Sequence, residues 1–428
     1  MSFSDWKEIP LEEAIEKLID YRGKTPKKTV SGIPLITAKI VKDGKINTPQ
    51  EFIDEDDYEA WMVRGFPKKG DVVLTTEAPL GEVASIDDEN IALAQRIVVL
   101  RGKKGLLDNT YLKYHLMSHD IQHQLQSRAS GSTVLGIKQS ELRKIILKTP
   151  PMKVQQKIAD NLDLLYQLSK QNETIFSNLD SIISALFRSW FIDFDPVKAK
   201  SEGKSPYGMD EETSALFPDT LEDSELGPIP AGWRVSSVSK ICKMSSGGTP
   251  SRSEEEYFSE SSEGYPWLAS RELNGNIIHD AEEYISELGL KNSSAKLFPQ
   301  NSVAMAMYGA TAGRIGYFAK PMTTSQAVCV MIANKNICLP KYLYFLLESE
   351  SWKIVWMNAT GGAQPNISQQ IIAKHRIVLP PLEIIQKFES VVDELFANID
   401  TTSIQSKKLS EIRDALLPRL MSGELSFS

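Results

Sequence analysis

A long amphipathic segment occurs twice in this chain, and it limits the possible folds more than any other feature. Residues 152–190 contain no glycine or proline, and they follow the pair Pro150–Pro151. Their apolar side chains recur mostly in steps of three and four residues, which is the spacing of a coiled-coil helix. These side chains are Ile158, Leu162, Leu165, Phe176, Leu179, Ile183, Leu186 and Trp190. Such a helix is about 58 Å long, longer than a globular core requires, and indicates a spacer or a partner surface.

The second copy begins 230 residues later, where Pro380–Pro381 repeats the proline pair. From Leu382 to about Leu420 the apolar spacing recurs, at Phe388, Val392, Leu395, Leu409, Leu416 and Leu420. Upstream landmarks recur as well: Gly23 to Pro26 as Gly247 to Pro250, Gly81 as Gly313, Gln95 as Gln326 and Gly131 as Gly361. The chain is therefore predicted to be a tandem duplication whose halves share a scaffold and differ in their loops.

Two details distinguish the second copy. Thr25 and Gly32 are 7 residues apart, whereas Thr249 and Gly264 are 15 apart, so the second copy carries eight extra residues there. Pro418 stands where the first copy has Arg188, which predicts that the second long helix is kinked or ends sooner.

Each half has an α/β pattern ahead of its long helix. Short buried strands are predicted at residues 72–74, 97–100, 145–147, 303–305, 328–331 and 376–379, and helices at 111–117 and 342–347. The predicted organisation is an α/β (α+β) domain at 1–150, a first long helix at 151–192, a linker at 193–232, a second domain at 233–380, and a second long helix with a C-terminal tail at 381–428. The linker is rich in proline, glycine and acid, so it is predicted to be mostly extended.

Composition places few limits on function. The 428 residues are 41% hydrophobic and 24% charged, as in ordinary globular proteins. There is no membrane-length apolar run, and the three cysteines show no C-x-x-C pairing, which favours a reduced, cytoplasmic setting. The net charge of −8 comes mainly from residues 193–232, which hold ten acidic and three basic side chains. The two domains are neutral to slightly basic, so charge neither predicts nor excludes DNA binding.

The motifs of an enzyme are missing from the sequence. Gly203–Lys204–Ser205 lacks the first glycine of a phosphate-binding loop, because Lys198 stands at that position. The two Pro–Pro pairs lack the polar residue and the aromatic residue that flank them in the target-base loop of DNA amino-methyltransferases. They are better interpreted as boundaries of the helices that follow.

Two groups of residues have side chains that could bind a metal. His115, His119 and His123 are spaced to line one face of a helix, but the second copy has Phe345, Ser349 and Lys353 there. A polar helix face is therefore the preferred interpretation. The carboxylates between Glu51 and Glu59 follow no metal-loop spacing, and a solvated surface is preferred for them too. No metal site is predicted.

Two further stretches have distinctive amino-acid sequences. Residues 186–197 are LFRSWFIDFDPV and residues 226–233 are LGPIPAGW. Together with the duplicated halves, the Gly-Thr-Pro starts and the Pro-Pro helix ends, these stretches resemble the DNA-sequence-specificity subunits of type I restriction-modification systems. The resemblance covers essentially the whole chain.

The resemblance implies a non-catalytic subunit. Two target-recognition domains would be held apart by two antiparallel coiled-coil helices, with pseudo-twofold symmetry, and each would recognise one half of a split, asymmetric DNA site. The implied partners are double-stranded DNA, two DNA methyltransferase subunits and two restriction or translocase subunits, with no membrane. No cofactor is implied for this subunit; S-adenosylmethionine, and ATP with magnesium, are expected on the partners.

Residues on the repeated loops are the candidates for contacting DNA, because equivalent loops should meet the same groove geometry. In the first half they are Thr25, Lys27, Lys28, Lys39, Thr76, Gln95, Arg128, Ser132 and Lys138; in the second, Thr249, Arg252, Arg271, Tyr308, Arg314, Gln326, Gln364 and Asn366. Two alternatives remain open: a coiled-coil adaptor whose flanking domains bind protein, and a self-contained methyltransferase or nuclease. The adaptor predicts no salt-dependent affinity for DNA, and the enzyme predicts modification or cutting by the protein alone.

Overall fold

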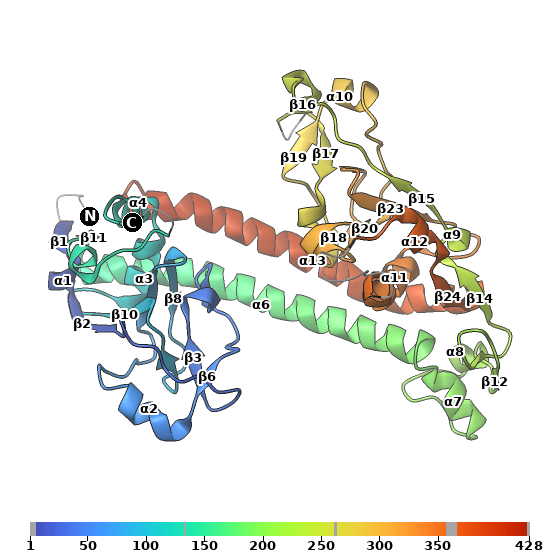
Figure 1. Ribbon diagram of the computed structural model, residues 1–428, viewed down its shortest axis with the longest axis horizontal. Coiled ribbons are helices and arrows are strands. Elements are labelled where there is room, and N and C mark those ends of the chain that lie inside the picture. The colour runs from blue at the N-terminus through green and yellow to red at the C-terminus, as the bar shows by residue number, and fades with distance from the viewer. Residues whose placement is uncertain (1–5, 132–133, 261–262, 357–365, 426–428) are drawn as a thin grey trace. The chain divides into compact units, whose positions relative to one another are not determined.

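The structure is a computed structural model, and it describes residues 6–131, 134–260, 263–356 and 366–425. The chain divides into two compact units (Figure 1). The first unit comprises residues 1–171 and 406–428, and the second comprises residues 172–405. Each long helix therefore contributes one part to each unit.

The first unit is built on a four-stranded sheet, in the order β2-β10-β7-β8, and a smaller sheet, in the order β6-β3-β9. Its strands are β1 (Lys7–Pro10), β2 (Ile15–Asp20), β3 (Ile33–Ile36), β4 (Val41–Lys42), β5 (Lys45–Ile46), β6 (Phe52–Ile53), β7 (Val72–Thr76), β8 (Leu80–Ser85), β9 (Ala92–Leu93), β10 (Ile97–Gly102) and β11 (Ile146–Thr149). Its helices before the long ones are α1 (Leu11–Ala14), η2 (Ala38–Ile40), α2 (Glu55–Trp61), α3 (Asn109–Met117), α4 (His119–Ser127) and α5 (Gln139–Leu142).

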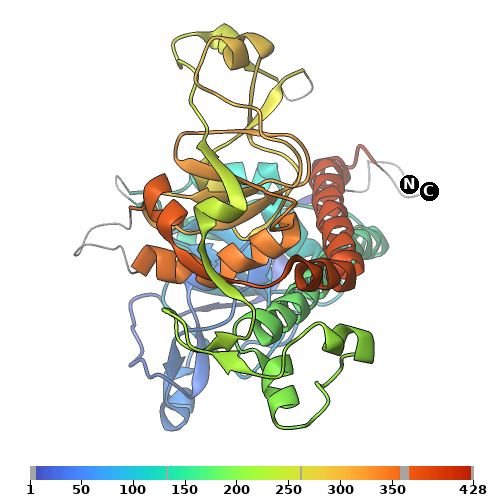
Figure 2. The same cartoon turned by 90° about the vertical axis from the view of Figure 1, so that its right-hand side faces the viewer.

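The second unit repeats this plan with a five-stranded sheet, β15-β23-β20-β21-β18, and a smaller sheet, β16-β19-β17-β22. Its strands are β12 (Leu221–Glu222), β13 (Ile229–Pro230), β14 (Arg234–Ser237), β15 (Cys242–Ser246), β16 (Phe258–Ser259), β17 (Tyr265–Leu268), β18 (Asn276–Ile278), β19 (Glu283–Ile285), β20 (Val303–Ala306), β21 (Ile315–Phe318), β22 (Thr323–Thr324), β23 (Val328–Ala333) and β24 (Arg376–Leu379). Its shorter helices are α7 (Asp195–Ser201), α8 (Glu211–Ala215), α9 (Val238–Ile241), η3 (Glu255–Tyr257), η4 (Ser270–Glu272), α10 (Glu287–Lys291), η5 (Gly309–Thr311), α11 (Pro340–Trp356) and α12 (Gln369–Lys374). Figures 1 and 2 show β16, β17, β19 and α10, in yellow, projecting beyond the five-stranded sheet.

The strand registers confirm the duplication. In the first unit Leu74 of β7 pairs with Val98 of β10, and in the second Met305 of β20 pairs with Cys329 of β23. The parallel pairs agree as well, because Ile36–Leu93 recurs as Leu268–Thr324. The six predicted strands and both predicted helices are confirmed, apart from Ile145, which lies just before β11.

The long helices α6 (Met152–Phe191) and α13 (Leu382–Met421) have 40 residues each, and in Figure 1 they are green and red. In the first unit the start of α6 packs with the end of α13, through Ile158 and Leu162 on one helix and Leu420 on the other. In the second unit the end of α6 packs with the start of α13, where the rings of Phe187 and Phe388 lie 5.7 Å apart. The two helices therefore run antiparallel, as predicted.

Pro418 does not end α13 early. The helix continues to Met421, and the Ser422 N–H donates to the Pro418 carbonyl at 2.9 Å. Leu420 and Met421 are buried in the core of the first unit, so packing outweighs the backbone hydrogen bond that a proline removes. The prediction of an earlier end is wrong.

The prediction of a mostly extended linker is also wrong. Residues 193–232 form α7, α8 and the β12–β13 hairpin. Val197, Phe217 and Ile229 are buried in the same core as Trp190 and Phe191 of α6. A few well-spaced apolar residues are enough to fold an acidic segment onto an existing core.

The three histidines do not share a helix face. Ser118 has extended backbone angles, so it ends α3 after His115 and precedes α4, which starts at His119. His115 is buried and accepts a hydrogen bond from the Lys148 N–H at Nε2, 3.0 Å away. Burial lowers the pKa of His115 to about 4, so the ring is neutral at physiological pH.

The carboxylate-rich segment near Asp54 has a structural role in capping. The Asp54 side chain caps α2 by accepting a hydrogen bond from the Asp56 N–H at 3.0 Å. No helix in the described part of the chain is long and apolar enough to cross a membrane.

Candidate nucleic-acid interface

One end of each main sheet gathers several connecting loops. In the first unit β2 and β7 end where β8 and β10 begin, because Asp20 pairs with Val98, Thr75 with Ile97, and Thr76 with Leu80. In the second unit the corresponding pairs are Ser246 with Cys329, Ala306 with Val328, and Met305 with Ile315. Loops from distant parts of the sequence therefore meet at this end.

The loop before α5 or α12 joins the same end in both units. The Ile137 N–H donates to the Thr76 carbonyl at 3.0 Å, and the Ile367 N–H donates to the Met307 carbonyl at 2.9 Å. Next to these bonds, Glu77 forms an isolated antiparallel β-bridge with Gly136, and Tyr308 forms one with Asn366. We call the residues assembled here the recognition end: 21–25, 77–81, 94–96 and 134–138 in the first unit, and 247–249, 308–314, 325–327 and 366–368 in the second.

Eight of the predicted contact residues lie at the recognition ends. They are Thr25, Gln95 and Lys138 in the first unit, and Thr249, Tyr308, Arg314, Gln326 and Asn366 in the second, and all are exposed or half-buried. Lys39 and Arg271 occupy equivalent places just outside, in η2 after β3 and in η4 after β17. β3 pairs in parallel with β9, and β17 pairs in parallel with β22; β9 and β22 each lead into a recognition end. The internal repeat therefore identified loops that lie close together in the folded domains.

Three predicted residues need correction or fall outside the structure. Thr76 is only 2% exposed, because β7 is a central strand covered on both faces, so its side chain is not available to DNA. Ser132 and Gln364 lie outside the described residues. Lys27 is exposed in the segment between β2 and β3.

Half of the predicted cations form ion pairs with carboxylates. The pairs are Lys28–Glu51 at 2.8 Å, Arg128–Glu141 at 3.8 Å, Arg252–Glu283 at 2.5 Å and Arg271–Glu282 at 2.6 Å. The hydrogen bond from Arg252 lowers the pKa of Glu283, which keeps this carboxylate charged. Within the described ranges Lys27, Lys39, Lys138 and Arg314 form no ion pair, so these four are the better candidates for phosphate contacts.

Sequence reasoning missed some residues at the recognition ends. Glu77 and Arg96 form an ion pair at 3.5 Å beside the Glu77–Gly136 bridge. Glu77 occupies the position of Tyr308 in the repeat, so aligning the two halves at this loop would have identified it. Different side chains at matched positions are typical of two modules with different targets.

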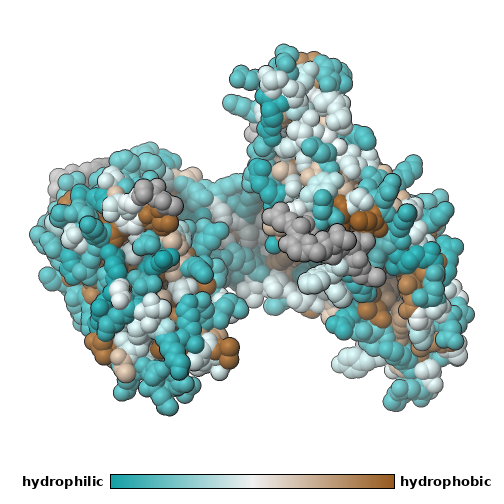
Figure 3. Space-filling model, in the orientation of Figure 1, coloured by the Kyte–Doolittle hydropathy of each residue, from teal (hydrophilic) through white to brown (hydrophobic). Residues whose placement is uncertain are grey.

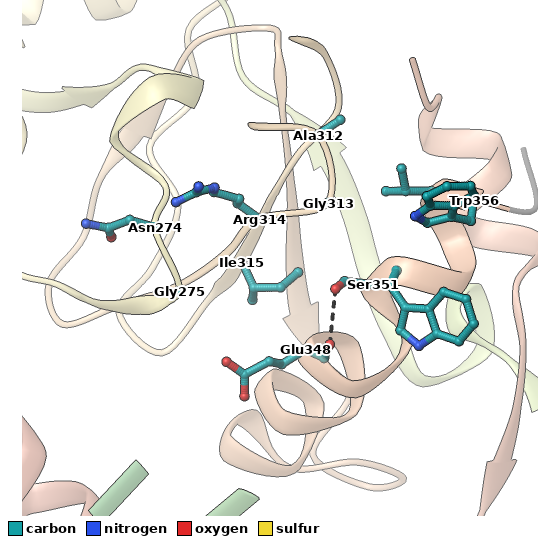
Figure 4. Close-up of a pocket in the computed structure, with 11 residues that line it drawn as sticks. Asn274, Gly275, Ala312, Gly313, Arg314, Ile315, Glu348, Ser351 and Trp356 are labelled. Carbon is teal, nitrogen blue, oxygen red and sulfur yellow. Dashed lines mark hydrogen bonds between the residues drawn. The ribbon is translucent and has the colours of Figure 1, made fainter. Parts of the chain in front are cut away.

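Trp352 and Trp356 were also missed, because the helix was predicted only over residues 342–347, whereas α11 continues to Trp356. They are 61% and 74% exposed and border a pocket of about 380 Å³ (Figure 4). In Figure 4 the Arg314 side chain extends toward Asn274 on one wall, and Trp356 stands on the opposite wall. Exposed indole rings offer faces for stacking or apolar contact. On the face drawn in Figure 3, hydrophilic residues cover most of each unit, and hydrophobic residues are scattered.

The fold and these loops define a class of protein. Two modules share one scaffold, and each presents exposed amide, hydroxyl and cationic side chains on matched loops. Those groups suit a polar, anionic partner. The molecule is a two-module recognition protein.

Comparison with known proteins identifies the family. The model of the type I restriction modification DNA specificity domain matches residues 4–176 and 230–413. The chain therefore belongs to the specificity subunits of type I restriction-modification systems, which are non-catalytic. The two matched segments are the two copies of the repeat.

Similar proteins carry the same description. The chain is 30% identical to the type I restriction enzyme MjaIX specificity subunit of Methanocaldococcus jannaschii, over 99% of this chain and 95% of that protein. It is 27% identical to the HindI specificity subunit of Haemophilus influenzae, over 84% and 87% of the two chains. The solved S subunit of a type I system from M. genitalium has the same fold, with a TM-score of 0.60 at 15% identity, covering 97% of this chain and 96% of that chain.

Proposed function

We propose that this chain recognises the two halves of a bipartite, asymmetric DNA site, one with residues 1–150 and the other with residues 233–380. The two recognition ends support this proposal, because they have the same backbone bridges but different side chains. Glu77 and Gly136 form the bridge in the first unit, and Tyr308 and Asn366 form it in the second. One scaffold with two sets of loop residues suits two different half-sites.

The chemistry of the recognition ends supports DNA as the target. Amide and hydroxyl side chains can bond to base edges, and lysine and arginine can bond to phosphates. Gln95, Gln326 and Asn366 supply amides, whereas Lys138 and Arg314 supply charge. The domains carry little net charge, so phosphate binding depends on these local cations.

The long helices have the dimensions of a spacer between half-sites. Each has 40 residues, or about 60 Å at 1.5 Å per residue, whereas B-DNA completes a turn in about 34 Å. We propose that helix length sets the number of unread base pairs between the half-sites.

Catalysis would reside on partner subunits. The duplication supports two DNA methyltransferase subunits, and two restriction subunits where these are present, one of each per half. S-adenosylmethionine, and ATP with magnesium, belong to those partners in this proposal, and the complex acts in the cytoplasm.

Salt dependence of DNA binding tests the proposal against the adaptor alternative. If Lys27, Lys39, Lys138 and Arg314 each contact one phosphate, affinity for random-sequence duplex should fall about a hundredfold between about 50 and 200 mM salt. Fluorescence anisotropy with the purified full-length chain measures this directly. Affinity that does not depend on salt supports the adaptor instead.

A single substitution sharpens this test. Lys138→Gln should reduce the slope of log affinity against log salt by about 0.9, the value for one phosphate contact. Lys204→Gln is the matched control, because Lys204 pairs with Glu202 at 2.7 Å outside both recognition ends. Its slope should equal that of the unmodified chain.

A further inference from the structure

The turn that carries Thr249 is tightly packed in the second unit. A Cβ atom on Gly247 would lie 2.0 Å from the Thr324 carbonyl oxygen, and one on Gly248 would lie 2.3 Å from Ser294 Oγ. The Gly248 N–H also donates to the Thr324 carbonyl at 2.9 Å. Only glycines allow so close an approach, so the backbone of this turn is fixed against the end of β22.

A second set of contacts braces the same turn. The indole of Trp267 is 4% exposed and donates from Nε1 to the Gly248 carbonyl at 2.9 Å. The Arg252 guanidinium lies 5.2 Å from the centre of the Trp267 ring and 4.6 Å from that of Phe258. Arg252 was predicted to contact DNA, but these contacts and its ion pair with Glu283 give it a role in holding the turn.

The fixed turn places the Thr249 hydroxyl against Gln326. Thr249 Oγ1 donates a hydrogen bond to Gln326 Oε1. A glutamine amide has one acceptor oxygen and one NH₂ group with two donors. Because Thr249 holds the oxygen and the Gln326 side chain is exposed, the NH₂ group is left to face outward.

We propose that Thr249 is a positioning residue, and that Gln326 uses its outward N–H groups to bond a hydrogen-bond acceptor on DNA. The proposal rests on the DNA-recognition function above. Such acceptors occur on base edges in the major groove, as N7 and O6 of guanine, N7 of adenine and O4 of thymine, and on phosphate oxygens. An amide oriented in advance loses less rotational freedom on binding.

The first unit lacks this arrangement. A Cβ atom on Gly23 would have no neighbouring atom within 4 Å, and among the described residues no hydrogen bond joins Thr25 to Gln95. Thr25 is exposed, and Gln95 is half-buried. The two copies keep the same threonine and glutamine, but only the second holds the amide in one orientation.

Four variants of the full-length chain test the orientation. Each is used to select from a pool of randomised duplex DNA, and its affinity for the duplex preferred by the unmodified chain is then titrated. Gln326→Ala should weaken binding about tenfold, as for one lost hydrogen bond. Gln326→Glu should weaken it about a hundredfold, because a carboxylate would face the acceptor. Thr249→Val should weaken binding less than Gln326→Ala, and Thr249→Ser should restore it.

The relative losses of affinity of these variants decide whether the proposal holds. If Gln326→Glu binds as well as Gln326→Ala or better, the N–H groups do not face an acceptor and the inference is overturned. Thr249→Val binding equal to that of the unmodified chain removes the positioning role. Loss of preference at one base pair identifies a base edge as the acceptor, whereas uniform weakening with an unchanged motif identifies a phosphate.

Two controls separate this result from other failures. Thermal unfolding of each variant reports whether it folds, and the half of the motif that residues 1–150 recognise should be unchanged. If the unmodified chain selects no motif and shows no salt-dependent affinity, the proposed function itself fails, and the inference falls with it.

Discussion

Glu348 and Glu350 lie two residues apart on α11, and their carboxyl groups have opposite pKa shifts. Burial raises the pKa of Glu348 to about 7, with a further contribution from Asp180 on α6. Burial also opposes ionisation of Glu350, but hydrogen bonds from His375 and Lys353, at 3.0 and 2.7 Å, outweigh it and lower its pKa. The second unit therefore contains one carboxyl group that favours folding when neutral and one that favours it when charged.

Glu348 makes stability fall as pH rises. Its folded pKa is raised above the unfolded value of 4.5, so its contribution is complete below that value and is lost as pH rises through about 7. Glu348→Gln should therefore stabilise the protein at pH 8 by about 1–2 kcal/mol and have little effect near pH 5. This magnitude is less than the full shift because Glu348 borders the pocket of Figure 4. Urea unfolding at the two pH values measures it.

Glu350→Gln is the matched control, and its effect should have the opposite sign. A lowered folded pKa means that the stabilisation is present above the unfolded value and is lost as pH falls. Glu350→Gln should thus destabilise the protein at pH 8. Equal effects of the two substitutions at pH 8 would contradict the assignment of neutral and charged carboxyl groups.

For individual residues, the sequence identified candidate contact positions but not the side chains with which they pair. Thr249 and Gln326 were found because both recur in the repeat. The pairing of Arg252 with Glu283, 31 residues away, depends on how β19 lies beside the second recognition end, and no local pattern encodes it. Thr76 was predicted to contact DNA, although it lies in a strand that is covered on both faces.

The individual helices and strands were more predictable. The first long helix runs from Met152 to Phe191, within one residue of each predicted bound, because a proline pair precedes it and no glycine or proline interrupts it. The linker was not predictable to this degree, since its buried residues are separated by acid, glycine and proline. The break between α3 and α4 at Ser118 was equally hidden, because the sequence around it suits one continuous helix.

A change in helix length tests the spacer proposal. Four extra residues within 165–180 of α6 lengthen the helix by about 6 Å, which corresponds to about two base pairs of DNA. The unread spacer in the recognised site should lengthen by one or two base pairs while both half-sites stay the same. Sequencing of methylated genomic DNA from cells that carry the variant and its partners would measure it.

An insertion elsewhere controls for general disturbance. Four residues added between Tyr207 and Gly208, in an exposed turn of the linker, should leave the spacer unchanged. If the α6 insertion also leaves the spacer unchanged, helix length does not determine it.

The whole molecule is a duplication, and this was its most predictable property. Proline pairs, glycines and glutamines recur at nearly constant offsets, so the sequence itself revealed two modules and two long helices. The parallel pairs β3–β9 and β17–β22 were not foreseen, because strands of two to four residues carry too little periodicity. Those short strands place Lys39 and Arg271 beside the recognition ends.

In the proposed function each module recognises its own half-site. This division can be measured by mapping methylated positions across the genome of a host, for the natural chain and for one whose residues 1–150 come from another specificity subunit. We predict a motif of two different half-sites around a fixed unread spacer, with one half replaced and the other retained after the exchange. A change in both halves, or a single uninterrupted motif, would show that the two modules do not recognise separate half-sites.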